Sequence, residues 1–173
     1  MDQAAMFRQI KHPKSKIKMG LLDFLKPKPK DIFSDADEQA IVAAVRNAER
    51  RTSGEVRVFI ESRCRFVDAV DRAAEIFFNL KMDQTELKNA TLVYVAVKDK
   101  QMAVFGDEGI HNKVTSAFWN AEVKKMMQHF KTNQIPQGII AAVNDIGEAL
   151  YQHFPFDKDN DRNELPDDIV FGK

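Results

Sequence analysis

The clearest feature in the pattern of apolar and polar positions is a nearly unbroken apolar and β-branched run from Thr91 to Val97. Such a run is typical of a strand that is buried on both faces at the centre of a sheet. Charged residues 98–100 interrupt the run, and the apolar pattern resumes at residues 102–105. The short gap predicts a β-hairpin, in which the second strand lies antiparallel beside the first.

Upstream of this hairpin, the pattern predicts a helix, a strand and a second helix. An apolar stripe at helical spacing follows a capping-box-like start at Ser34 and ends at residues 52–54. Residues 55–61 form the predicted strand, and residues 66–82 return to the period of a helix. A strand, a helix and a strand in succession predict a right-handed βαβ unit, so the strands that begin near residues 55 and 91 should be parallel.

Two amphipathic helices are predicted downstream, at residues 114–131 and from Pro136 to about His153. Each has one apolar stripe, and both therefore need an apolar surface to cover. We predict an α/β fold, a three-layer αβα sandwich with a small mixed β-sheet, over residues 33–154. Residues 1–32 are expected to form a basic flexible arm, and residues 155–173 an acidic tail that packs on the domain.

Composition and charge narrow the classes of function. The 26 basic and 26 acidic residues give a formal charge of zero, which makes no electrostatic case for nucleic-acid binding. The charge is unevenly placed, because residues 1–30 hold eight Lys or Arg against two Asp, whereas residues 157–168 hold six acids against two bases. The single cysteine excludes an intramolecular disulfide and favours a cytoplasmic location.

No segment is long and apolar enough for a transmembrane helix, and no signal peptide is evident. Signatures of common enzyme classes are also absent: the chain has no P-loop, no G-x-G-x-x-G, no G-x-S-x-G and no H-E-x-x-H. Arg63 and Arg65 flank Cys64, which favours a reactive thiol, but Val70 stands where a cysteine phosphatase has arginine. We therefore predict no catalytic residues.

A glycine-framed acidic segment, Gly106-Asp-Glu-Gly-Ile-His111, directly follows the hairpin and is expected to form a loop. The hairpin returns it to the end of the sheet where the strands near residues 55 and 91 begin. Carboxylate, carbonyl and water oxygens are the ligands that Ca²⁺ or Mg²⁺ prefers, so this segment is a candidate cation site. The alternative is a solvent-exposed turn that is rich in acids. The predicted metal ligands here are Asp107 and Glu108, and the other predicted binding residues are Glu55, Asn89, Gly109 and His111.

A second acidic cluster lies in the tail, where three acids alternate with other residues as in a calcium loop. It is not an EF-hand, because Arg162 replaces the glycine and Asp168 replaces the bidentate glutamate. Antiparallel packing of the last two helices should return the chain to the Asp107 segment. We therefore expect both clusters to share one or two divalent cations, with plain solvated charge as the alternative. The tail ligands are Asp157, Asp159, Asp161 and Glu164.

The hairpin and its surroundings resemble the TPM-domain family, named after a thylakoid lumen protein, a photosystem II repair protein and a nematode receptor modulator. The resemblance rests on the strand led in by Asn89, the tight charged turn, the second strand and the glycine-bounded acidic segment. It includes Thr52-Ser53-Gly54-Glu55, which is similar to the family's Thr-Gly-x-Glu entry into its first strand. The resemblance implies the αβα architecture and, without a signal segment or tail helix, a stand-alone soluble bacterial-type member.

Function is predicted from these features together. The primary hypothesis is a metal-responsive binding or regulatory module for Ca²⁺ or Mg²⁺, with an unidentified protein partner left open, rather than an enzyme. One alternative is a metal-assisted acid phosphatase, because that activity has been assigned to a thylakoid member of the family that the chain resembles. Another is a membrane-peripheral adaptor that works through the basic N-terminal arm.

Overall fold

The computed structural model describes residues 33–156 and 165–172. Its helices and strands, in chain order, are α2 (Asp35–Glu49), β1 (Val56–Glu61), α3 (Ala69–Asn79), the short 3₁₀ helix η2 (Met82–Gln84), β2 (Thr91–Ala96), β3 (Gln101–Gly106), α4 (Glu108–Lys131), α5 (Ile135–His153) and β4 (Val170–Phe171). The four strands form one sheet in the order β3-β2-β1-β4.

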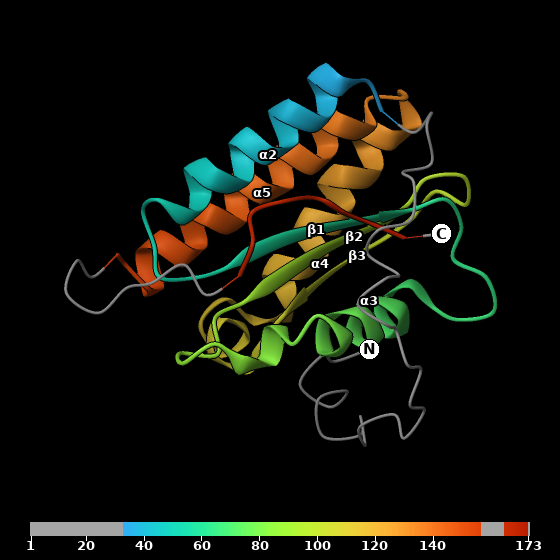
Figure 1. The fold of residues 1–173 in the computed structure, drawn as a ribbon. Helices are drawn as coiled ribbons and strands as arrows, with labels where there is room; N and C mark the ends of the chain where they lie inside the picture. The colour runs from blue at the N-terminus through green and yellow to red at the C-terminus, as the bar shows by residue number, and fades with distance from the viewer. Residues whose placement is uncertain (1–32, 157–164, 173) are drawn as a thin grey trace.

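The sheet is the middle layer of a three-layer αβα sandwich (Figure 1). Helices α2, α4 and α5 cover one face, where their apolar stripes pack with Val58, Val93 and Val104 from the three long strands. Helix α3 covers the other face together with η2. The predicted fold class is therefore confirmed, with a separate apolar core on each side of the sheet.

The three long strands pair as the sequence predicts. All six residues of β2 are buried, because β2 lies between β1 and β3 and is covered on both faces. Strands β1 and β2 are parallel, with Val56 opposite Thr91, and β2 and β3 form the antiparallel hairpin, with Thr91 opposite Gly106.

Residues from the tail supply the fourth strand, which the sequence analysis did not predict. Strand β4 is parallel to β1, with Phe59 opposite Val170 and Ile60 opposite Phe171. The amide of Gly172 also donates to the carbonyl of Ile60 at 2.8 Å. A two-residue strand has no periodicity of its own, and its pairing depends on the edge of β1, which lies far away in the sequence.

Two helices, α3 and α4, have boundaries that differ from the prediction. Helix α3 is shorter than residues 66–82, because Asp68 caps its N-terminus and Lys81 adopts a left-handed conformation just beyond its C-terminal end. Helix α4 begins at Glu108 instead of residue 114, with a kink at Thr115, where φ is 66°. The predicted acidic loop at 106–111 is therefore wrong: apart from Gly106 and Asp107, this segment is the first turn of α4.

Candidate cation site at the acidic end of the sheet

Three segments that are distant in the sequence meet at the end of the sheet where β1 and β2 begin and β3 ends. The amide of Thr91 donates to the carbonyl of Glu55 at 2.8 Å, and the amide of Asp107 donates to that of Ala90 at 2.9 Å. The amide of Ile110 donates to Lys88 at 3.2 Å. We call this region the acidic end, and it carries the side chains of Glu49, Glu55, Asn89 and Asp107.

Asp107 is the N-cap of α4 and is buried. Its Oδ1 accepts the amide hydrogen of Glu108 at 2.7 Å, whereas Oδ2 is buried without a hydrogen-bond partner among the described residues. Burial raises the pKa of Asp107, although the Glu108 amide and the charge of Lys88 act in the opposite direction. An aspartate at the strand-helix junction is a favourable cap, which explains why a helix begins where we predicted a loop.

Gly109 and His111, two of the predicted binding residues, have structural contacts in the first turn of α4. A Cβ on Gly109 would lie 2.6 Å from the carbonyl oxygen of Lys88 and still nearer that of Leu87, so glycine is needed for this close approach. His111 is buried, and its Nδ1 accepts the indole N–H of Trp119 at 3.0 Å. The predicted ligand Glu108 is exposed on the outside of the same turn.

Further oxygens at the acidic end are buried without a hydrogen-bond donor in the part of the chain that the structure describes. Asn89 donates from Nδ2 to the carbonyl of Ser53 at 3.1 Å, and its Oδ1 has no such partner. The hydroxyl oxygens of Thr85 and Thr91 are in the same situation. Buried polar atoms normally find partners, so the amide, carboxylate and hydroxyl oxygens at this end of the sheet retain a hydrogen-bonding capacity that the described residues do not use.

Glu55 belongs to a carboxylate group along the outer edge of β1. Glu49 accepts the amide hydrogen of Val56 at 2.9 Å, and its pKa is raised to about 8 by burial and then by the nearby charges of Glu55 and Asp167. Arg57 is buried beside the same acids, and burial lowers its pKa. A cleft of about 850 Å³ opens between α2 and this edge, lined in part by Arg46, Glu49, Glu55, Phe156 and Asp167.

Sequence reasoning missed Glu49, Arg57 and Asp167 as members of this group. Glu49 ends a helix, where a glutamate is ordinarily solvated, and Asp167 lies in a run of tail acids. Arg57 occupies an otherwise apolar strand, and a charge inside such a strand was the one available signal.

The tail ligands Asp157, Asp159, Asp161 and Glu164 lie outside the described residues. The tail does leave the domain at the acidic end, because Pro155 forms a β-bridge with Thr52 and the amide of Ser53 donates to the carbonyl of Phe154 at 3.0 Å. Within residues 33–156 and 165–172, no three His, Cys, Asp or Glu side chains are arranged to hold a metal ion.

Comparison with known proteins identifies the family. A model of the TPM domain matches residues 28–149, so the chain belongs to the TPM-domain family, as its sequence predicts. Comparison with curated proteins gave no match.

Two solved structures are similar to the chain. The NMR structure of the BA42 protein from the psychrophilic bacterium Bizionia argentinensis is 41% identical, with a TM-score of 0.76, and the match covers 84% of this chain and 99% of that one. The N-terminal domain of the cg2496 protein from Corynebacterium glutamicum has a TM-score of 0.56 at 16% identity, over 69% and 74% of the two chains. The second likeness concerns the fold alone.

The helices in the described part of the chain are all too short or too polar to cross a membrane. This agrees with the sequence analysis, which found no transmembrane segment.

Proposed function

We propose that this TPM domain is a divalent-cation-binding module of regulatory function, with its site at the acidic end of the sheet. The observation that carries the proposal is the buried carboxylate of Asp107, whose pKa is raised and whose Oδ2 has no partner among the described residues. A bound cation would supply the missing partner and stabilise the ionised form of Asp107.

The chemistry of the site favours a hard cation. Asp107, Asn89 and Thr91 offer carboxylate, amide and hydroxyl oxygens, and a soft metal would require nitrogen or sulfur ligands. His111 does not offer Nδ1, because that atom accepts the Trp119 indole N–H. Ca²⁺ fits this donor set better than a transition metal.

The described residues alone supply fewer oxygens than the six to eight that Ca²⁺ takes. The tail acids Asp157, Asp159, Asp161 and Glu164, together with Glu108, are the proposed source of the remainder. Their proximity is supported by Ser53, which receives a hydrogen bond from Asn89 and donates one to Phe154, at the start of the tail. Binding would therefore order the tail against the acidic end.

An NMR titration with Ca²⁺, followed by Mg²⁺, tests this proposal. We expect saturable shifts that occur together in the amides of residues 106–111 and 157–168. The variant Asp107→Asn keeps a side-chain oxygen for the Glu108 cap and should lose the shifts at 106–111. The matched control Asp71→Asn removes one charge from an exposed position on α3 and should bind as the wild type does.

The same titration can contradict the proposal. Shifts confined to the tail would reduce the site to weak ion attraction, and no shifts at millimolar ion would exclude it. Metal-dependent hydrolysis of a generic phosphomonoester that Asp107→Asn abolishes would instead assign an enzyme. Arg57 favours the enzyme alternative, because its guanidinium lies beside the acids and could bind a phosphate group.

A further inference from the structure

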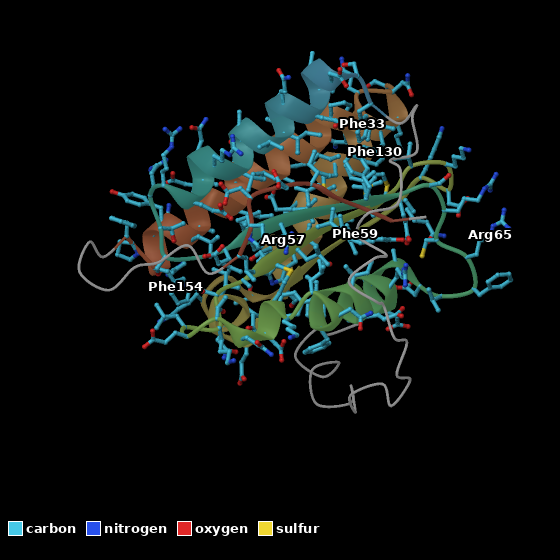
Figure 2. All side chains as sticks on the ribbon, viewed as in Figure 1. Phe33, Arg57, Phe59, Arg65, Phe130 and Phe154 are labelled. Atoms are coloured by element: carbon cyan, nitrogen blue, oxygen red, sulfur yellow. The ribbon has the colours of Figure 1, made fainter. Side chains whose placement is uncertain are left out.

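The opposite end of the sheet, where β1 and β2 finish, is basic. The loop at residues 62–68 projects there beyond the sheet and α3, beside the turn between β2 and β3 (Figure 1). Four exposed basic side chains extend from the loop and the turn: Arg63, Arg65, Lys98 and Lys100. Arg65 lies at the outer side of the molecule, away from the helices (Figure 2). We call these two segments the basic end.

The loop carries a large apolar side chain that none of the described residues covers. Phe66 is 100% exposed and Val67 is 46% exposed. The φ of Phe66 is 70°, in the left-handed region that bulky residues rarely adopt. The fold therefore holds a large apolar side chain in water and in an unfavourable backbone conformation. Observed strain of this kind points towards function when the surroundings enforce it.

The surroundings do enforce the shape of the loop. Asp99 accepts a hydrogen bond from the Cys64 amide at 2.9 Å and forms an ion pair with Arg63 at 3.0 Å. The Lys98 amide donates to the carbonyl of Ser62 at 2.9 Å. Cys64 is buried against the core under α3, which fixes the base of the loop.

The acids of the basic end are already engaged within the protein. Asp99 binds Arg63 and the Cys64 amide, and Asp68 caps α3 by accepting the Val70 amide hydrogen at 2.8 Å. Arg65, Lys98 and Lys100 form no ion pair with any residue that the structure describes. The two segments hold four basic side chains against Asp68 and Asp99, so their net charge is positive.

From this arrangement we propose that the basic end docks on an anionic lipid surface, with Phe66 and Val67 inserted at the level of the headgroups. Two apolar side chains are much less than the roughly 800 Å² per partner that a stable protein interface buries. A bilayer accepts single apolar side chains and requires no complementary groove, and anionic headgroups complement Arg65, Lys98 and Lys100.

The basic segment that precedes α2 strengthens this choice of partner. Helix α2 ends close to the start of β1, at the acidic end, and lies along the sheet. Its N-terminal end, with Phe33 just before it, therefore lies towards the basic end (Figure 2). Residues 1–30, which precede Phe33 in the sequence, carry eight Lys or Arg against two Asp. A single weak anchor gives marginal membrane binding, and a second basic signal in the same chain strengthens it.

Vesicle co-sedimentation of the full chain tests the proposal. We expect binding to phosphatidylcholine vesicles that contain phosphatidylserine, and little binding to phosphatidylcholine alone. Phe66→Gly removes the apolar side chain, suits the left-handed conformation and should weaken binding by about tenfold, as expected for a buried phenylalanine. Arg65→Gln and Lys98→Gln should each weaken it by about fivefold.

Matched controls separate docking from general surface properties. Leu87→Ser and Arg50→Gln remove an exposed apolar and an exposed basic side chain from the opposite end of the sheet, and both should bind as the wild type does. A Phe66→Trp variant adds a local readout, because the one native tryptophan, Trp119, is buried. Its fluorescence should shift to the blue only with phosphatidylserine vesicles.

Several outcomes would overturn the proposal. One is a complete lack of vesicle binding, and another is unchanged binding of Phe66→Gly with loss of binding on removal of residues 1–30. A third is Phe66→Trp emission that does not shift when the protein sediments with vesicles. Phe66→Gly leaves the acidic end intact, so Ca²⁺ titration of that variant distinguishes failure of this proposal from failure of the cation site.

Discussion

The two ends of the sheet differ in whether their carboxylates have a cationic partner within the protein. At the basic end, Glu61 is buried and accepts two hydrogen bonds from Arg72, at 2.9 and 3.0 Å, and one from the Tyr94 hydroxyl at 2.5 Å. At the acidic end, Glu49 and Asp107 form no ion pair with any described residue, and burial raises the pKa of both. A carboxylate that serves the fold has its partners within the protein.

Carboxylates that are partly or fully buried without an internal ion-pair partner are characteristic of sites that act on something outside the protein. The raised pKa of Glu49 and Asp107 means that folding shifts both groups towards their neutral forms relative to the unfolded chain. The pKa of Arg72, in contrast, is raised chiefly by its hydrogen bonds to Glu61, which secures a charged pair. This contrast is why the cation site is proposed at one end of the sheet and not at the other.

The largest expected effect on stability comes from breaking the ion pair between Glu61 and Arg72. Glu61→Ala removes the acceptor of the buried Tyr94 hydroxyl and leaves the Arg72 guanidinium with Glu75 alone, so the free energy of unfolding should fall by about 3 kcal/mol. Urea unfolding followed by circular dichroism measures the change. The control Glu75→Ala removes the partly exposed partner of Arg72 and should cost less than about 1 kcal/mol. Equal losses in the two variants would show that Glu61 is not specially compensated.

A smaller loss is expected from crowding the acidic end. Gly109→Ala places a Cβ against the backbone carbonyls of Leu87 and Lys88, which cannot easily move. We expect a loss of about 2 kcal/mol from overpacking, measured by thermal unfolding. Asn112→Ala, one turn along the exposed face of α4, should be nearly neutral. A stabilised Gly109→Ala variant would mean that helix propensity outweighs the close approach of α4 to the 85–88 turn.

The smallest expected effect is a change in the pH dependence of stability. Glu49 keeps its proton up to about pH 8 in the folded chain, whereas an unfolded glutamate ionises near 4.5. Between these values the folded state binds more protons, so its stability falls as pH rises, and above about pH 8 the loss is complete.

Glu49→Gln should flatten this dependence and raise stability at about pH 8 by roughly 1 kcal/mol, a value discounted because Glu49 is partly exposed. The glutamine keeps an oxygen for the Val56 amide. Urea unfolding of both proteins at several pH values measures the difference. Some dependence of stability on pH should remain in Glu49→Gln, because the pKa of Asp107 is also raised. Identical slopes in the variant and the wild type would contradict the assignment to Glu49.

Much of the fold could be predicted from the sequence because its strongest signals are local. The apolar run at residues 91–97 and the charged turn after it specify β2 and the hairpin, and helical stripes specify the faces that α2, α4 and α5 bury. Strand β4 could not be predicted in this way. Its two residues gain their conformation from pairing with Phe59 and Ile60, a contact without a local pattern.

The site was less predictable, for a similar reason. The sequence indicated Asp107, but the glycines on either side of the acids suggested a loop, whereas Asp107 caps α4 and Gly109 permits close packing. The group of Glu49, Glu55 and Asp167 arises because the tail folds back along β1. Only the three-dimensional arrangement shows that these carboxylates meet.

The buried position of Cys64 has a practical consequence for experiments on this protein. It is the only thiol in the sequence, and it is covered at the base of the 62–68 loop. A thiol reagent can reach it only when this end of the molecule opens, so the rate of alkylation reports the free energy of a local opening. The native chain therefore contains its own chemical probe of one end of the sheet, and no introduced label is needed to follow it.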